Sequence, residues 1–379
     1  MTAKAATFRL TAKQRGFTLA ELVIAVATSS LLVAGMTSAI FLAVRSADTN
    51  SGTALAIQGS MVLEDIAAEL RDAVYFKQRT ATSVMFTVPD RDGDGDVETI
   101  RYSWTGTAGA SLLREYNGGS AIPTVDDVHG FQLAYTIDTN ATANKILFVV
   151  PNESSLDADD SAKQTSFQSW GYSVQPVTAA RTNAQIDALA AAADAIYISE
   201  NIVASDLNTK LNDAKAGIVN EVGALHDDLE LASSAGVSYT GTQIRIADNT
   251  HYVTSPFNIG VLSITATAQY LGRMNGTLAT DLQTIAQDFG GTNSSLTVIG
   301  TGGRLEDGTP ALGPRLNWPI GNDFSFSALN SAGLTLLQRA VDWAARKYTV
   351  TSVGITLQVG SDGSSAVQTA TEIRSKPRA

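Results

Sequence analysis

The sequence contains no cysteine among its 379 residues, which excludes disulfides, thiolate metal sites and a cysteine nucleophile. Charged residues are only 17% of the chain and hydrophobic residues are 44%, a balance typical of a folded protein. Basic residues are also scarce, because 26 Lys and Arg face 37 Asp and Glu, giving a formal net charge of −11. This negative charge leads us to expect no nucleic-acid partner. The length of the chain allows two domains.

Positive charge is concentrated at the N-terminus, where residues 1–16 carry Lys4, Arg9, Lys13 and Arg15 and no acid. An apolar run from 17 to 44 follows, interrupted by one carboxylate and by small hydroxyl residues. As a helix this run exceeds the roughly 30 Å of bilayer hydrocarbon, so it predicts a transmembrane helix with a cytoplasmic N-terminus and exported C-terminal domains. A secretory signal peptide, with a shorter apolar core, is the alternative.

Residues 15–23 (RGFTLAELV) closely resemble the processing site of type IV prepilins and type II secretion pseudopilins. The resemblance implies that prepilin peptidase cuts between Gly16 and Phe17 and that the new N-terminus, Phe17, is methylated. It also implies that Glu21 pairs with the N-terminal amine of a neighbouring subunit, which would offset the cost of a carboxylate in hydrocarbon. The implied partners are the peptidase, sibling pilin subunits and the inner membrane.

Apolar residues at helical spacing predict that a helix continues past the membrane through Leu55, Val62, Ile66, Leu70 and Val74. Period-two alternation then predicts an antiparallel meander of strands, and two more strands stand at the far end of the chain. The predicted strands are 83–88, 99–104, 112–117, 131–137, 352–359 and 366–373.

Between these two groups of strands, the spacing of the apolar residues changes. Strands predicted at 145–150, 172–177, 195–199, 217–220, 263–270 and 295–299 alternate with helices predicted at 158–170, 183–193, 206–213 and 334–347. This alternation predicts a mostly parallel sheet covered on both sides. Three stretches, SFQSWGYSV, AIYISE and 316–344, resemble a flavodoxin-like module of bacterial surface proteins, akin to the class I glutamine amidotransferase-like fold.

The predicted fold class is therefore an α+β pilin-like domain, with a long N-terminal transmembrane helix and an antiparallel sheet, interrupted by an α/β flavodoxin-like domain. The predicted organisation is a leader (1–16), an assembly helix (17–44), a pilin-like part (45–138), an inserted α/β domain (142–347) and a closing hairpin (348–379). Insertions are tolerated where the two ends of a loop lie close together. A simple tandem, in which the last hairpin belongs to the second domain, is the alternative.

Catalytic signals are weak in the inserted domain. Amidotransferases of the similar fold use a cysteine at a strand-to-helix elbow, and the comparable stretch here is 219–221 (VNE), without a G-x-S-x-G replacement. We therefore predict that the protein is not an enzyme. His226 with Asp227 and Asp228, joined by Glu200 or Glu221, is a candidate base or metal site, and a solvated helix cap is the alternative. Residues 300–303 (GTGG) favour a tight turn over a nucleotide loop.

An acidic loop lies between the first two predicted strands, at 90–98 (DRDGDGDVE). Its alternation matches the first half of a calcium loop, with Asp90, Asp92 and Asp94 as oxygen donors, a carbonyl from Asp96 and a carboxylate from Glu98. An EF-hand is disfavoured because its twelfth position, normally glutamate, is arginine here. A metal-free turn is the alternative, since Asp and Gly clusters make good turns unaided. Ca²⁺ is the one candidate cofactor.

The sequence as a whole predicts a minor pilin or pseudopilin, a structural subunit of a type II secretion or type IV pilus filament. The alternative is an envelope-anchored surface protein whose α/β insert binds or hydrolyses a ligand such as carbohydrate.

Overall fold

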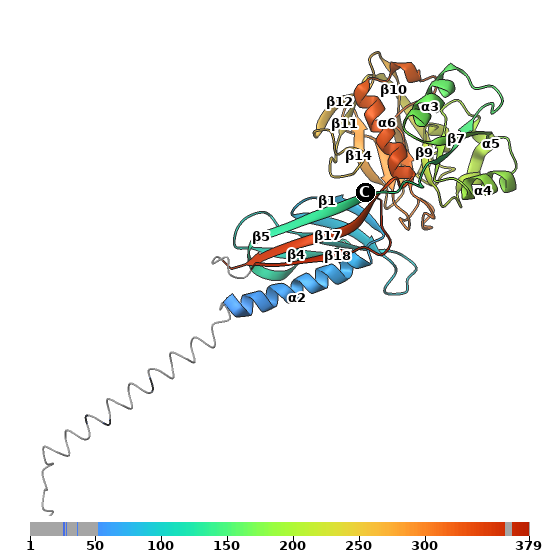
Figure 1. The fold of residues 1–379 in the computed structure, drawn as a ribbon. Helices are drawn as coiled ribbons and strands as arrows, with labels where there is room; N and C mark the ends of the chain where they lie inside the picture. The colour runs from blue at the N-terminus through green and yellow to red at the C-terminus, as the bar shows by residue number, and fades with distance from the viewer. Residues whose placement is uncertain (1–25, 27, 29–35, 37–51, 361–365, 379) are drawn as a thin grey trace, which may run out of the picture. The chain divides into compact units, whose positions relative to one another are not determined.

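The computed structural model describes Val26, Thr28, Met36, residues 52–360 and residues 366–378 (Figure 1). The chain divides into two compact units, Met1–Leu55 and Ala56–Ala379, and all the strands belong to the second. The predicted leader and cleavage site, with Gly16, Phe17 and Glu21, lie outside the described residues. In the described ranges no helix is both long and apolar enough to cross a membrane. The predicted single-pass membrane topology is therefore corrected and not carried further.

The first sheet has seven strands in the order β1-β2-β3-β4-β5-β17-β18, all paired antiparallel. Its strands are β1 (Tyr75–Arg79), β2 (Ser83–Val88), β3 (Glu98–Ser103), β4 (Ala110–Tyr116), β5 (Ile122–Thr139), β17 (Tyr348–Val359) and β18 (Ala366–Glu372). β5 and β17 lie side by side although more than two hundred residues separate them, with Tyr348 opposite Thr139. The domain division predicted from the sequence stays a prediction, but this pairing is compatible with an insertion.

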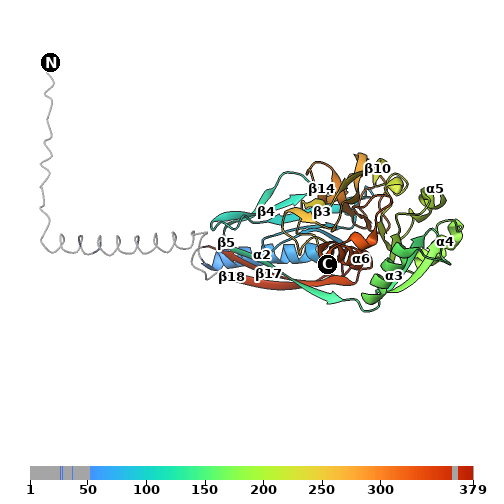
Figure 2. The same ribbon diagram turned by 90° about the horizontal axis from the view of Figure 1, so that it is seen from above.

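The helix α2 (Gly52–Arg71) packs against this sheet from its second turn onward (Figures 1 and 2). Its apolar side chains recur at helical spacing, and Ile66 and Leu70 are completely buried. Gly59 lets the helix approach closely, because a Cβ atom there would lie 3.1 Å from the Val367 side chain. Glu69 fixes the register by accepting hydrogen bonds from the Tyr102 hydroxyl at 2.6 Å and from Arg114 Nη2 at 2.6 Å.

The second sheet has nine strands in the order β12-β11-β14-β15-β16-β9-β8-β6-β7. The parallel part comprises β7 (Ser173–Thr178), β6 (Lys145–Val150), β8 (Ala195–Ile198), β9 (Gly217–Asn220) and β16 (Arg315–Asn317). The antiparallel part adds β15 (Ser294–Ile299), β14 (Gln283–Asp288), β11 (Gln243–Ile246) and β12 (Gly260–Ser263). A separate ribbon pairs β10 (Ala232–Gly241) with β13 (Gln269–Leu278).

Helices cover both faces of the parallel part, because its strands are apolar on both sides. In β6, Ile146, Phe148 and Val150 join a core with α3 (Ala158–Ser169) and α6 (Ser331–Ala344). The alternate residues Leu147 and Val149 join a second core. That core is covered by α4 (Asn183–Ala191), α5 (Ala204–Leu207) and the 3₁₀ turns Asn208–Leu211 and Gly223–Leu225. A continuous apolar strand is what a sheet buried on both faces requires.

The predicted fold class is wrong. The described residues contain eighteen strands, β1–β18, against the five α-helices α2–α6, and none of these helices is a transmembrane helix. The error lies mainly between 232 and 299, where the sequence reasoning placed two strands and the structure has six. Stretches such as 232–241 (ASSAGVSYTG) are rich in Ser and Gly, so they lack the apolar alternation that signals a strand. The predicted strand 263–270 instead spans the end of β12, a linker and the start of β13.

Candidate metal centre

The acidic loop joins β2 to β3 at the end of a hairpin in which Val88 pairs with Glu98. Asp90 organises the loop, since its carboxylate accepts hydrogen bonds from the backbone N–H of Gly93 at 2.6 Å and of Gly95 at 2.9 Å. Both glycines have positive φ, 84° and 92°, a conformation that other residues rarely adopt. These backbone donors hold the pKa of Asp90 below its ordinary value, so the carboxylate is charged at neutral pH.

Glu98 is the buried member of the loop, with only 1% of its surface exposed. One carboxylate oxygen, Oε1, accepts hydrogen bonds from the backbone N–H of Arg91 at 2.8 Å and of Asp92 at 3.3 Å. The other oxygen, Oε2, accepts no hydrogen bond from any residue in the described part of the chain. The Tyr116 side chain lies close to Glu98, because burial and then the Glu98 charge raise the pKa of Tyr116. A buried carboxylate oxygen without a partner is costly unless something else, such as a cation, contacts it.

Asp90, Asp92 and Glu98 each offer one carboxylate oxygen, and the three oxygens lie within 4.8 Å of one another. Calcium–oxygen distances are about 2.3–2.6 Å, so two oxygens on opposite sides of one Ca²⁺ ion are separated by about twice that distance, roughly 5 Å. Mg²⁺ requires oxygens at about 2.0–2.1 Å in a near-ideal octahedron and usually keeps several waters, whereas Ca²⁺ accepts a more flexible set of carboxylate oxygens. The chemistry of the donors and their spacing therefore fit Ca²⁺.

The other two predicted ligand residues, Asp94 and Asp96, direct their carboxylates to other partners. Asp94 Oδ1 accepts a hydrogen bond from the backbone N–H of Asp96 at 2.9 Å. The Asp96 carboxylate forms an ion pair with Arg304, which belongs to the loop after β15. Beside this pair, Val97 fills the space over Gly302, where a Cβ atom would lie 2.7 Å from Val97 Cγ1. The acidic loop thus joins the first sheet to the second sheet.

The GTGG stretch forms this contact and a turn. Gly303 N donates to Gly300 O at 3.1 Å, and Gly302 has a φ of 82°. A Cβ atom on Gly300 would lie 2.6 Å from the ring of Tyr75 in β1. The glycines are therefore explained by close packing between the two sheets, and the predicted tight turn is present at residues 301–302.

The histidine candidate does not form the site that its sequence neighbours suggested. His226 is buried, and its Nε2 lies 2.6 Å from Asn317 Oδ1. Within the described residues it forms no hydrogen bond or ion pair with Glu200 or Glu221, which pair with Lys163 instead. Burial lowers the pKa of His226 to about 4, so the ring is neutral at physiological pH. His251 is also buried, packs edge-on against Trp343 and has its pKa lowered by burial to about 3.

A second acidic cluster, which sequence reasoning missed, lies at the carboxyl ends of β8 and β9. Lys163 from α3 is completely buried and donates to Glu200 and, at 2.7 Å, to Glu221 Oε2. Glu221 also accepts a hydrogen bond from the hydroxyl of Tyr197. The Ser199 hydroxyl accepts a hydrogen bond from Lys163 Nζ at 3.2 Å and donates one to Asp160 Oδ1 at 2.5 Å. In the sequence, Asp160, Lys163 and Phe167 recur at helical spacing within the helix predicted at 158–170, which places the lysine on the face that is buried.

The charges of this buried cluster do not balance, since one lysine faces three carboxyl groups. Burial raises the pKa of Glu221 well above its ordinary value, and burial also raises the pKa of Asp160. Burial would raise the pKa of Glu200 too, but its hydrogen bond with Glu221 and the attraction of Lys163 lower it overall. Glu221 therefore retains a proton that Glu200 releases. All the groups have partners within the protein, so the cluster is a self-contained ion network.

Comparison with known proteins gives few similarities. No family model matches the chain, and no curated protein matches it. Among solved structures, a putative ThuA-like protein from Bacteroides uniformis ATCC 8492 is similar over 55% of this chain and 93% of its own. The sequence identity is 11% and the TM-score is 0.36, which is too low to support an argument about function.

These findings overturn the resemblance to type IV pilins and type II pseudopilins. Neither a pilin family match nor a membrane-spanning helix within the described residues supports it, so the predicted role as a filament subunit is withdrawn. The alternative of an anchored surface protein acting on carbohydrate has no support either. The predicted partners, the absence of enzymatic activity and the calcium cofactor stay predictions.

Proposed function

We propose that this protein binds Ca²⁺ in the β2–β3 loop and that the bound ion stabilises the contact between its two sheets. Asp90, Asp92 and Glu98 would supply carboxylate oxygens. The observation that carries the proposal is the free Oε2 of Glu98, buried beside two aspartates whose oxygens lie within 4.8 Å. A cation there would remove the repulsion among three carboxylates and give the buried oxygen a partner.

The consequence for the protein follows from the connections of the loop. Its next residues are Asp96, which pairs with Arg304, and Val97, which packs on Gly302. An ion that fixes residues 90–98 would therefore also fix the side chains that contact the second sheet. Calcium would act as a structural ion rather than as a catalyst, because all three ligands come from a single hairpin loop at one edge of this contact.

The test is isothermal titration of the whole chain with Ca²⁺ and, separately, with Mg²⁺. We expect one saturable calcium site, with Mg²⁺ binding weaker by about tenfold or more because of the coordination geometry. In Glu98→Gln one carboxylate charge is lost, and we expect calcium affinity to fall about tenfold or more. Asp307→Asn is the matched control, since Asp307 is an exposed turn aspartate that accepts from Thr309 N at 2.8 Å. Equal calcium affinity in wild type and Glu98→Gln would refute the proposal.

A further inference from the structure

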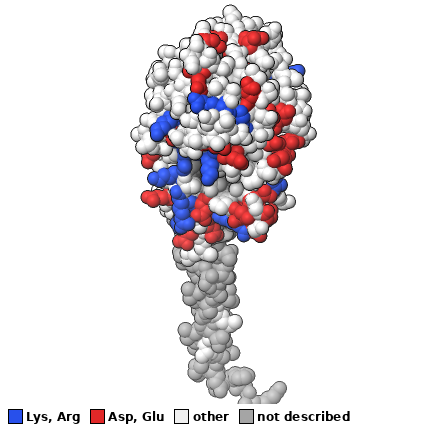
Figure 3. All heavy atoms as spheres, turned by 90° about the vertical axis from the view of Figure 1, so that its right-hand side faces the viewer, with Lys and Arg blue, Asp and Glu red and all other residues white. Residues whose placement is uncertain are grey.

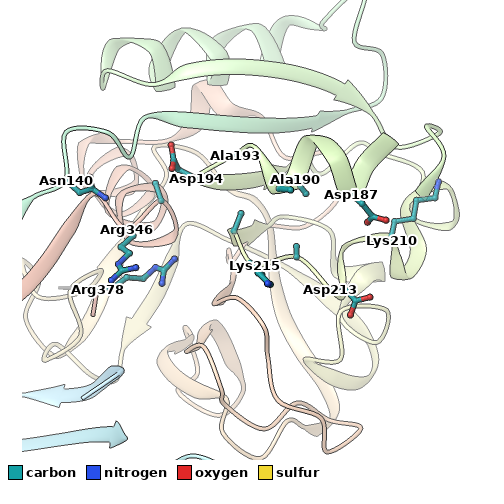
Figure 4. Close-up of a pocket in the computed structure, with 14 residues that line it drawn as sticks. Asn140, Asp187, Ala190, Ala193, Asp194, Lys210, Asp213, Lys215, Arg346 and Arg378 are labelled. Carbon is teal, nitrogen blue, oxygen red and sulfur yellow. The ribbon is translucent and has the colours of Figure 1, made fainter. Parts of the chain in front are cut away.

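A cavity of about 550 Å³ lies beside the two chain segments that connect the sheets (Figure 4). Asn140 lines it directly after β5, and Arg346 lines it directly before β17. The segments are held together there, because Asn140 N donates to Lys347 O at 2.7 Å. A second cavity of about 310 Å³ shares Asn140 and Arg346 with the first. Both cavities therefore lie beside the two chain segments that connect the first sheet to the second.

Two arginines dominate one end of the larger cavity. Figure 4 shows the guanidinium groups of Arg346 and Arg378 side by side, with Asp187 and Asp213 at the opposite end. Asp194 lines the same side as the arginines, and its Oδ2 accepts hydrogen bonds from the backbone N–H of Asn144 and Lys145 at 2.9 Å. Neither arginine forms an ion pair with any described carboxylate. Burial lowers the pKa of Arg378 to about 9, and the nearby charge of Arg346 adds to this effect. Two adjacent, partly buried cations without an acidic partner repel each other.

The hydrogen bonds of these arginines leave donors unused. Arg378 donates from Nε to Trp343 O at 2.8 Å and from Nη2 to Ala344 O at 3.2 Å, which caps the C-terminus of α6. Arg346 donates from Nε and Nη2 to the carbonyls of Ser375 and Lys376. In the described structure the Nη1 group of each arginine has no acceptor. Both arginines line the cavity, and a guanidinium pair with unused N–H donors is suited to an oxyanion.

We infer that this cavity binds an oxyanion, a phosphate or carboxylate group of a small molecule, between Arg346 and Arg378. Lys210 and Lys215 also line the cavity. Lys210 Nζ donates to the backbone carbonyls of Ala179 and Arg181, whereas the Lys215 side chain is exposed and adds a positive charge to the lining. The lining carries four basic side chains against the three aspartates Asp187, Asp194 and Asp213, whereas the formal net charge of the whole chain is −11. On the face shown in Figure 3, acidic and basic side chains are interspersed instead. An anion bound here would stabilise the crossing between the sheets.

The probe is inorganic phosphate, titrated into the whole chain in calcium-free buffer and followed by calorimetry and by thermal unfolding. We expect saturable binding and a rise in Tm with phosphate concentration. Arg346→Gln should weaken phosphate binding by about tenfold or more, since it removes a charge-assisted donor. Arg346 also tethers the C-terminal segment, so a second variant, Lys215→Gln, is needed. The Lys215 side chain is exposed and forms no hydrogen bond within the described chain. We expect Lys215→Gln to lower the affinity for phosphate severalfold.

Arg374→Gln is the matched control, because Arg374 is a neighbouring arginine that is 71% exposed and pairs with Asp72 outside the cavity. It changes the net charge by the same amount and should leave phosphate affinity unchanged. Absence of saturable binding to the wild-type chain would overturn the inference. So would an equal loss of affinity in Arg374→Gln and Lys215→Gln, because it would indicate a response to net charge alone.

Discussion

The protein holds two clusters of three carboxyl groups, and they solve the same electrostatic problem differently. In the second sheet, Asp160, Glu200 and Glu221 surround a buried lysine, and the network needs nothing from solution. In the first sheet, Asp90, Asp92 and Glu98 gather around no basic side chain, and the buried Glu98 Oε2 has no partner among the described residues. This difference is the basis for our proposal that an external cation completes the first cluster.

The largest effect should come from removing the internal cation. Lys163→Met leaves the buried carboxyl groups unpaired, so we expect a loss of about 3–5 kcal/mol in the free energy of unfolding, or failure to fold. Urea denaturation measures it. The triple variant Lys163→Met, Glu200→Gln, Glu221→Gln should recover most of this loss, because the charges disappear together. If the triple variant were no more stable than Lys163→Met, electrostatics would not be the cause.

Calcium should have the next largest effect, and only through the first cluster. At a free concentration about 100 times Kd, calcium should raise the free energy of unfolding by about 2.7 kcal/mol. Differential scanning calorimetry with calcium and with chelator checks this. Glu98→Gln should lose most of the calcium response, whereas Asp307→Asn should keep it. A response that survives in Glu98→Gln would place the site elsewhere.

The pH dependence of stability should separate the two clusters further. The folded-state pKa of Glu221 is raised, so the folded protein binds a proton more tightly than the unfolded chain does. Its contribution is fully present below the unfolded pKa, near 4.5, and is lost as pH rises through the folded value. Glu221→Gln should therefore flatten the decline of stability above pH 5 in urea titrations. An unchanged profile would contradict the assigned proton.

Replacing Asp96 should have the smallest effect on the free energy of unfolding. Asp96 and Arg304 are both partly exposed, with side-chain exposures of 33% and 42%, so their ion pair contributes about 0.2–1 kcal/mol. Asp96→Asn should lower stability by no more than this. Because Asp96 faces Arg304 rather than the oxygens of Asp90 and Asp92, calcium affinity measured by calorimetry should change little. A loss of affinity as large as in Glu98→Gln would make Asp96 a ligand.

Much of the local structure could be predicted from the sequence, because apolar periodicity is a local signal. The spacing of Ile66 and Leu70 identified the helix α2, and the continuous apolar run of residues 145–150 identified a strand buried on both faces. The acidic loop was recognised from its D-x-D-x-D-G alternation. Which of its acids gather could not be predicted, since Asp96 turns towards Arg304, more than two hundred residues away.

The features that could not be predicted from the sequence depend on contacts between residues that are far apart in the chain. Lys163, Glu200 and Glu221 meet because β8 and β9 are neighbouring parallel strands whose carboxyl ends lie at one edge of the sheet, beside α3. The strands β10 and β13 pair through Ser, Thr and Gly residues that carry no apolar alternation. The prepilin-like motif misled the assignment of the whole chain, because a short resemblance was extended to the domains that follow it.

The most direct test is a crystal structure of the chain grown with calcium, with anomalous scattering recorded from the ion or from a substituted lanthanide. The account predicts one peak about 2.3–2.6 Å from oxygens of Asp90, Asp92 and Glu98, with Glu98 Oε2 among them. A map at saturating calcium with no peak in this loop, or with the ion bound elsewhere and Glu98 Oε2 still without a partner, would contradict it.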